Sequence, residues 1–422
     1  MDRRYFLKTS GIALGTFGMM AAAPEFLHQF AAAQTAAKGF GKKKVLVTVF
    51  MRGAVDGLNM LVPHGDESYY SLRPSIAVAR PGKTDGALDL DGHFGLNPTM
   101  SSLMPLWKSG KLAAITAVGS PANTRSHFDA QDYMESATPG VKSTRDGWLN
   151  RVLQGLPEKE ASPFRAVSMT QQLPRSLYGK AESVAMTNLS DFSIKAGLYT
   201  ADMKGGFEGI YQQNVKDSLG EMGKETFEAV NYLKQANPAQ YKPENGAIYP
   251  AGSFGRSMMQ IAQLIKAGVG LEVAFTDTGN EIRWDTHTNQ GNGRGQLANY
   301  LRVFSEALAA FATDLGKRMD DVTVLTMSEF GRTARENGSR GTDHGHGNTM
   351  FAIGNSVKGG KVYGDFKGLK NSELNEGRDL AVTTDFRDVF AESIQTHLQA
   401  KDIAKIFPNY TTSKTKFKGF MS

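Results

Sequence analysis

The chain has 422 residues, of which 40% are hydrophobic and 21% are charged. This balance indicates a globular protein with a sizeable core and excludes a disordered or fibrous one. The formal net charge of +6 is spread along the sequence, and the densest basic run, 42–44, is too short to form a nucleic-acid-binding arm.

The chain contains no cysteine. Disulfides, thiolate metal sites and cysteine-ligated iron–sulfur clusters are therefore excluded. Histidine and carboxylate remain as the strong metal ligands, and the chain has only eight histidines.

The N-terminus has the pattern of a twin-arginine export signal. Arg3 and Arg4 are followed by a weakly hydrophobic, glycine- and alanine-rich stretch at 10–23 and by three alanines at 31–33. A basic N-terminal helix would not explain this order. We therefore predict a signal at 1–37 that the twin-arginine translocase recognises, and a periplasmic or otherwise extracytoplasmic mature protein. No other stretch is long and apolar enough to form a stable membrane span.

Short apolar, β-branched runs alternate with amphipathic stretches along the mature chain. The clearest amphipathic stretch has apolar residues at three- and four-residue steps from Leu297 to Leu315. The predicted strands are 44–51, 112–118, 269–276 and 322–327. The predicted helices are 99–108, 127–135, 254–266, 297–315 and 384–398. This alternation predicts an α/β fold with a mainly parallel sheet covered by helices on both faces.

Residues 155–252 have a looser pattern, with polar helical candidates at 207–236 and a stretch bearing proline and glycine at 237–252. We expect a cap or insertion here on one α/β domain that spans 38–422. In the last predicted helix, His397 lies near the C-terminus, where a structural role or an interaction with the helix dipole is expected.

Ligands of parallel α/β sheets bind beyond the carboxyl ends of the strands, and polar residues follow all four predicted strands. Asp56 follows the first, and Arg125, Ser126 and His127 follow the second. Asp285 and His287 follow the third. Glu329 follows the fourth, and a glycine-rich loop with Asp343, His344 and His346 comes shortly after it.

This mixture of histidine and carboxylate suits zinc, manganese or iron, and several carboxylates would allow two cations to lie close together. We predict a centre for one or two divalent ions, zinc or manganese. The predicted ligands are Asp56, Asp285, His287, Glu329, Asp343, His344 and His346.

Each motif also has a plainer interpretation. An aspartate before glycine, as at Asp56, is typical of a turn, and the segment with Asp285 and His287 could be a surface loop. Ser126 could cap the helix that begins at His127. His127 could be a buried histidine bonded to the backbone, and Arg332 could pair with Glu329 or Glu336 on the surface.

At these residues the chain resembles a family of exported bacterial proteins designated domain of unknown function 1501 (DUF1501). The motifs that carry the resemblance are RGAVDGLN, RSHFDAQ, WDTH, SEFGRT, GTDHGHG and GNSVKGGKVYG. They occur in order over nearly the whole mature chain. The family is grouped with the alkaline-phosphatase-like superfamily of phosphatases, sulfatases, phosphodiesterases and cofactor-independent phosphoglycerate mutases.

That grouping implies an alkaline-phosphatase-like α/β sandwich, a two-metal centre and a serine or threonine nucleophile at a helix N-terminus. Asp56 matches the early metal aspartate, and Ser126 stands where the nucleophile precedes its helix. Asp285 and His287 resemble the aspartate–histidine pair for one metal. After the fourth strand the superfamily commonly has Asp-His-Gly. This chain has Glu329-Phe330-Gly331 there, and its Asp343-His344 pair comes later.

The resulting hypothesis is an exported metal-dependent hydrolase of phosphate or sulfate esters, acting on an anionic small molecule or glycan ester. Ser126 would attack, beside His127, and Arg52, Arg125 or Arg332 would hold the anionic group. The alternative is a non-catalytic envelope protein that keeps the fold and a structural metal and binds a partner. An exported redox enzyme is disfavoured because no dinucleotide-binding fingerprint follows any strand.

Overall fold

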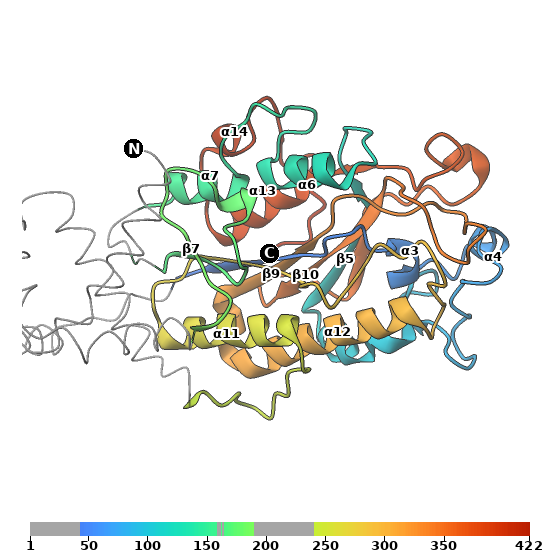
Figure 1. The fold of residues 1–422 in the computed structure, drawn as a ribbon, viewed down its shortest axis with the longest axis horizontal. Helices are drawn as coiled ribbons and strands as arrows, with labels where there is room; N and C mark the ends of the chain where they lie inside the picture. The colour runs from blue at the N-terminus through green and yellow to red at the C-terminus, as the bar shows by residue number, and fades with distance from the viewer. Residues whose placement is uncertain (1–42, 158–161, 163, 190–239) are drawn as a thin grey trace, which may run out of the picture.

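The computed structural model describes residues 43–157, 162, 164–189 and 240–422 (Figure 1). The predicted export signal at 1–37 and much of the expected insertion at 155–252, including its helical candidates at 207–236, lie outside the described residues. Both therefore stay predictions.

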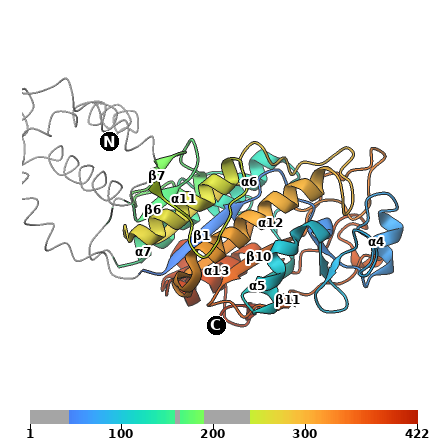
Figure 2. The ribbon, with the colours of Figure 1, turned by 90° about the horizontal axis from the view of Figure 1, so that it is seen from below.

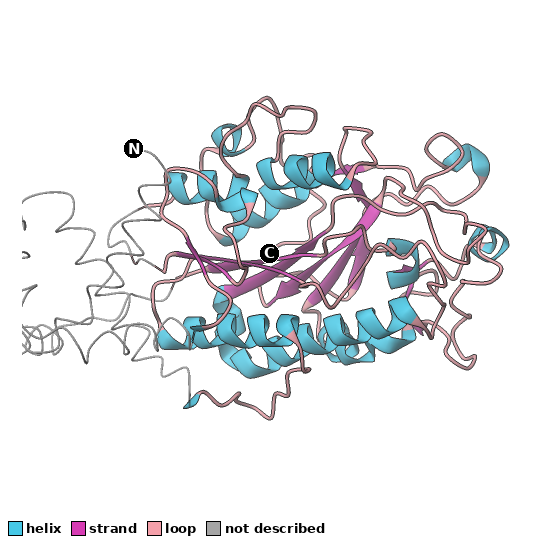
Figure 3. Ribbon diagram, in the orientation of Figure 1, coloured by secondary structure: helices cyan, strands magenta, loops and turns pink. Residues whose placement is uncertain are grey.

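A nine-stranded sheet forms the centre of the described chain (Figure 3). Its strand order is β11 (Lys361–Tyr363), β5 (Leu112–Gly119), β10 (Asn348–Gly354), β9 (Val322–Met327), β1 (Val45–Phe50), β8 (Val273–Asp277), β6 (Ala166–Ser168) and β7 (Val184–Ala185), and β12 (Thr384–Asp385) also pairs with β5. All neighbours are parallel except β10, which is antiparallel to β5 and β9. The predicted mainly parallel sheet is confirmed.

Helices cover both faces of this sheet (Figures 1 and 2). One layer contains α11 (Ser253–Ala267), α12 (Gln296–Leu315) and α5 (Met104–Lys108), and the other contains α6 (His127–Ser136), α7 (Trp148–Gly155), α13 (Phe386–His397) and α14 (Ile403–Ile406). The expected α/β sandwich is confirmed.

The apolar pattern explains why β1 lies in the middle of the sheet. All six of its residues are buried. Val45, Val47 and Val49 face the core beneath α11 and α12, whereas Leu46 and Phe50 face the core beneath α6, α7 and α13. A strand with both faces covered needs this continuous apolar run, and each such side chain contributes about 1.5–3 kcal/mol when fully buried.

The apolar stripe predicted from Leu297 to Leu315 is the buried face of α12. The predicted helix at 99–108 is divided into a 3₁₀ helix, Pro98–Leu103, and α5. Met100 breaks the helical backbone, and Pro105 has no N–H to donate to the preceding turn.

Several short elements surround this frame. They are α3 (Gly57–Met60), α4 (Glu67–Leu72), a small sheet of β2 (Leu61–Val62), β4 (Gly95–Leu96) and β3 (Leu88–Asp89), and 3₁₀ helices at Arg175–Leu177, Gly316–Asp321 and Asn371–Glu373.

The sequence did not predict β10, β11, β12, β6 or β7 as strands. The last two lie at the start of the expected insertion, and they extend the sheet beyond β8. Because β10 is antiparallel, it begins at the edge where β1, β5, β8 and β9 end. The glycine-rich loop between β9 and β10 therefore turns back at that edge.

Candidate metal centre

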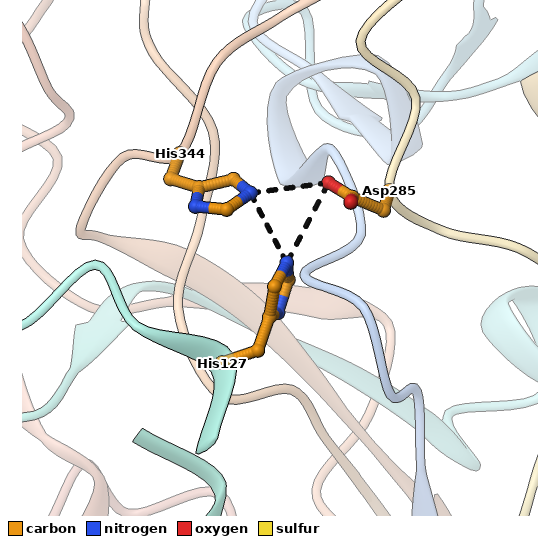
Figure 4. A group of neighbouring side chains, drawn as sticks. All are labelled: His127, Asp285 and His344. Atoms are coloured by element: carbon orange, nitrogen blue, oxygen red, sulfur yellow. Dashed lines mark hydrogen bonds and ion pairs between the residues drawn. The ribbon is translucent and has the colours of Figure 1, made fainter. Parts of the chain in front are cut away.

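Three loops bring histidine and aspartate together beyond the sheet edge (Figure 4). His127 is the first residue of α6, which follows β5. Asp285 follows β8, and His344 lies in the loop between β9 and β10. Their ligand atoms lie within 4.8 Å of one another. Strand topology therefore assembles a site from residues more than 200 positions apart.

The closest approaches involve Nε2 of His344. This atom lies 3.1 Å from Nε2 of His127 and 3.2 Å from Oδ1 of Asp285. Nε2 of His127 lies 3.6 Å from the same Asp285 oxygen. His287 adds a fourth group, because its Nε2 is 3.0 Å from both His344 Nε2 and Asp285 Oδ1. The segment with Asp285 and His287 is therefore part of the cluster.

Each of the three imidazoles has an acceptor for its other nitrogen. Nδ1 of His127 lies 2.8 Å from Glu329 Oε1, and Nδ1 of His287 lies 3.2 Å from Asp343 Oδ1. Nδ1 of His344 lies 2.9 Å from the carbonyl oxygen of Arg125. If each Nδ1 donates, the Nε2 lone pairs of the neutral rings all face the Asp285 carboxylate. Such an arrangement is repulsive unless a proton or a cation lies between the groups.

These residues fit a divalent transition metal. Imidazole nitrogen and carboxylate oxygen are ligands of zinc, manganese and iron. Metal-bound histidines almost always donate their other N–H to a carboxylate or a backbone carbonyl, and His127, His287 and His344 have such partners. The donor set therefore has both the ligands and the outer hydrogen bonds of a metal centre.

Glu329, a predicted ligand, stands behind His127. Its side chain is fully buried, and Oε1 accepts from Gly53 N at 2.8 Å and from Gln131 Nε2 at 2.9 Å in addition to His127. Burial alone would raise the pKa of the Glu329 carboxyl, but the hydrogen bonds from His127 and Gln131 hold that pKa below its usual value. An ionised Glu329 fixes the ring of His127.

Arg332 is not a surface residue. It is buried, and it donates to the carbonyl oxygens of Gly53, Ala54, Trp284 and Thr342 as well as to Asp285 Oδ1. It thus joins the loops after β1, β8 and β9. Burial would raise the pKa of Asp285, but the hydrogen bonds from His127 and Arg332 and the charge of Arg332 hold it well below its usual range.

The surroundings of His127 and His344 shift the pKa values of these two histidines in opposite directions. Hydrogen bonds to Asp285 and Glu329 raise the pKa of His127 to about 9, against the opposing effect of burial. Burial and the charge of His127 lower the pKa of His344, although its bond to the Arg125 carbonyl opposes this. The hydrogen bond from Asn337 lowers the pKa of the Asp343 carboxyl.

The structure does not bring Asp56 and His346 into the cluster. Asp56 is fully buried and paired with Arg73. His346 is also buried, and its Nε2 lies 2.7 Å from the carbonyl oxygen of Ser120. The backbone-bonded histidine that was considered for His127 is therefore His346. Asp343 contacts the cluster through His287, whose Nδ1 lies 3.2 Å from Asp343 Oδ1.

Ser126 stands at the N-cap position of α6 with an exposed side chain that forms no capping hydrogen bond. The side chain of Arg125 pairs with Asp379 at 2.7 Å and with Glu376 at 3.1 Å. Arg52 pairs with Glu135 and Asp277.

Sequence reasoning missed several residues that support the site, among them Arg73, Gln131 and Gln290. Gln131 lies four residues after His127, which places both on one face of α6, and this spacing could have revealed it. No local pattern points to Arg73, because its partner Asp56 precedes it by 17 residues across three short elements.

Comparisons with known proteins identify a family. A family model described as "Protein of unknown function (DUF1501)" matches residues 43–407. A comparison with curated proteins found no significant match.

The solved structures that are similar to the chain share little sequence identity with it. The PsFucS1 sulfatase from Pseudoalteromonas sp. is 11% identical, with coverage of 88% of this chain and 71% of that chain and a TM-score of 0.38. The C-terminal periplasmic domain of EcEptC from Escherichia coli, in complex with Zn, is 10% identical, with coverage of 75% and 74% and a TM-score of 0.33. An alkaline phosphatase from the Antarctic bacterium TAB5 is 10% identical, with coverage of 74% and 92% and a TM-score of 0.31.

Proposed function

The chain belongs to the DUF1501 family, and we propose that this member is an exported, metal-dependent hydrolase of phosphate or sulfate esters. The observation that carries the proposal is the convergence of three imidazole Nε2 atoms and one carboxylate oxygen beyond the strand ends. In this proposal His127, Asp285, His287 and His344 hold a divalent ion, zinc or manganese. A cation there would act as a Lewis acid toward an anionic ester group.

The proposed nucleophile is Ser126. Ser126 directly precedes the cluster residue His127, at the N-terminus of a ten-residue helix whose field favours an anion. Its hydroxyl is exposed and is not used as a helix cap. Attack by Ser126 would form a covalent ester with the transferred phosphoryl or sulfuryl group and release the alcohol, and water would then hydrolyse that ester to release phosphate or sulfate and regenerate the hydroxyl.

Among the arginines proposed for the anionic group, Arg125 is the best placed. Arg332 is buried and bonded to carbonyl oxygens and Asp285, so it positions the ligand loops. The side chain of Arg125 is 31% exposed, and within the described part of the chain its Nη1 makes no hydrogen bond. Those N–H groups could contact an ester oxyanion beside Ser126.

The decisive experiment combines metal analysis with an ester panel. Full-length mature protein, purified without chelator, is analysed for bound metal and then assayed on aryl phosphates and aryl sulfates. We expect bound zinc or manganese and turnover of at least one ester class. Ser126→Ala should cut turnover by several powers of ten with metal content preserved, whereas the neighbouring Thr124→Ala should not.

Three outcomes would contradict this proposal or a part of it. Metal-free protein that does not respond to added zinc or manganese would remove the metal centre. Bound metal without turnover on either ester class would favour the non-catalytic envelope protein. Full activity of Ser126→Ala on a verified ester would remove Ser126 from the mechanism.

The proposed export depends on Arg3 and Arg4. In the described part of the chain, every helix is too short or too polar to cross a bilayer. Because the translocase recognises the arginine pair, we expect Arg3→Lys with Arg4→Lys to retain the protein in the cytoplasm, measured by fractionation and immunoblotting. Unchanged periplasmic accumulation of the double variant would argue against the twin-arginine translocase as the partner.

A further inference from the structure

Asp56, which the resemblance matches to the early metal aspartate, is already held by a buried arginine. Asp56 Oδ2 lies 2.6 Å from Arg73 Nη1, and Asp56 Oδ1 lies 3.0 Å from Arg73 Nη2. Both residues are 0% exposed. Oδ2 also accepts from Gln290 Nε2 at 2.6 Å. The carboxylate is thus bound on both oxygens by protein donors.

The guanidinium of Arg73 has no unused hydrogen bond. Nε donates to the carbonyl oxygen of Ala334, Nη1 to Asp56 and Asn59, and Nη2 to Asp56 and the carbonyl oxygen of Thr333. These bonds use all the N–H donors that arginine has. A cation on Asp56 would leave a buried, unpaired guanidinium, which is strongly unfavourable.

Gln290 connects this pair to the loops that carry the cluster. Its Oε1 accepts from the hydroxyls of Thr286 and Thr342, which lie between Asp285 and His287 and directly before Asp343. Asp56 is therefore linked to the ligand loops by hydrogen bonds through Gln290.

The charges around the histidines also favour a single cation. Three carboxylates, those of Asp285, Glu329 and Asp343, touch the imidazoles, and Arg332 is paired with the first of them. Two negative charges are then left, and one divalent cation balances them. A second dication would leave uncompensated positive charge next to buried groups.

We propose that the centre takes one divalent cation per chain, and that Arg73 supplies at Asp56 the positive charge a second cation would bring. This inference rests on the proposed metal centre, and it departs from the two-metal centre that the resemblance implies. Asp56 is a positioning residue that acts on the ligand loops through Gln290.

The test is metal stoichiometry of the full mature chain. Apo-protein is titrated with Co²⁺ and with Zn²⁺, and bound metal per chain is measured by elemental analysis after desalting. Co²⁺ absorption is followed in parallel. We expect saturation at one ion per chain. Asp56→Asn should keep one ion, whereas Asp285→Asn should lose it.

A second variant guards against loss of folding in Asp56→Asn. The paired change Asp56→Leu with Arg73→Met removes both buried charges and leaves neither uncompensated, and it too should bind one ion. Two ions in the wild type, with one remaining in the Asp56 variants, would overturn this inference and leave the proposed function standing. No bound ion in the wild type would overturn both.

Discussion

The substitution Glu329→Gln tests whether the buried carboxylate behind His127 controls metal affinity. Glutamine has nearly the same shape as glutamate. Its amide oxygen can accept from His127, Gln131 and Gly53 as Oε1 does, and its NH₂ group can face the Ser328 hydroxyl that now lies 3.2 Å from Oε2. The fold should therefore survive, and the negative charge alone is lost.

The expected magnitude follows from the position of the carboxylate. Glu329 is 1% exposed, so solvent screens little of its effect on His127. Mutation of an outer partner of a metal-bound histidine typically costs 10–100-fold in metal affinity, or about 1.4–2.7 kcal/mol. We expect Glu329→Gln to raise the Kd for zinc by that factor.

Asp343→Asn is the matched control. It removes the carboxylate behind His287, but the Asp343 side chain is 53% exposed and hence more strongly screened. Its effect on affinity should be only a few-fold. The Kd values are measured by competition with a chromophoric chelator, and melting temperatures of the apo-proteins report on folding. An unchanged Kd in natively folded Glu329→Gln, or a larger loss in Asp343→Asn, would refute this reasoning.

Three further predictions concern metal dependence and stability. EDTA should lower the melting temperature of the purified protein and zinc should restore it. The reason is that a ligand that binds only the native state adds about 4.1 kcal/mol to the free energy of unfolding at a thousandfold excess over its Kd. Identical melting curves would contradict a bound metal. His344→Ala should abolish metal binding in elemental analysis, whereas His346→Ala should keep the metal and lower apo-protein stability, because His346 is buried against the Ser120 carbonyl. Burial lowers the pKa of His397 to about 4. As the pH falls, the unfolded state therefore binds a proton at His397 before the folded state does, and the free energy of unfolding should fall by about 2 kcal/mol between pH 7 and pH 5. His397→Gln should reduce that loss in urea unfolding, and an unchanged pH profile of the variant would contradict this prediction.

Four of the nine strands of the sheet could be predicted from the sequence, because a continuous apolar run can be recognised without knowledge of the strands it pairs with. The predicted strand at 322–327 has the bounds of β9, and the other three predicted strands overlap β1, β5 and β8. The short strands β6 and β7 have only three and two residues, so their pattern is too brief to distinguish them from loops. β10 is longer, but its antiparallel direction is a property of the fold and is not visible in its own residues.

For the candidate site, the sequence predicted which residues follow strand ends but not which way their side chains point. Of the predicted ligands, Asp285, His287 and His344 lie together in the structure, and His127 lies beside them. His344 and His346 are only two residues apart, yet one points to the cluster and the other to the Ser120 carbonyl. The turn into β10 decides this, and it depends on long-range pairing.

Dependence on long-range pairing also explains why the sequence did not reveal the partners of the buried charges. Asp56, Arg73, Glu329 and Arg332 are each at most 1% exposed, and a buried charge without a partner would cost several kcal/mol. Their partners come from segments up to about 280 residues away, as for Arg332 and the Gly53 carbonyl. The rim can therefore form only when β1, β8 and β9 are already aligned. A cation held by His127, Asp285 and His344 would bind only after this edge of the sheet has assembled, because its ligands come from different segments of the chain. Metal affinity and the stability of the sheet edge must therefore be thermodynamically coupled.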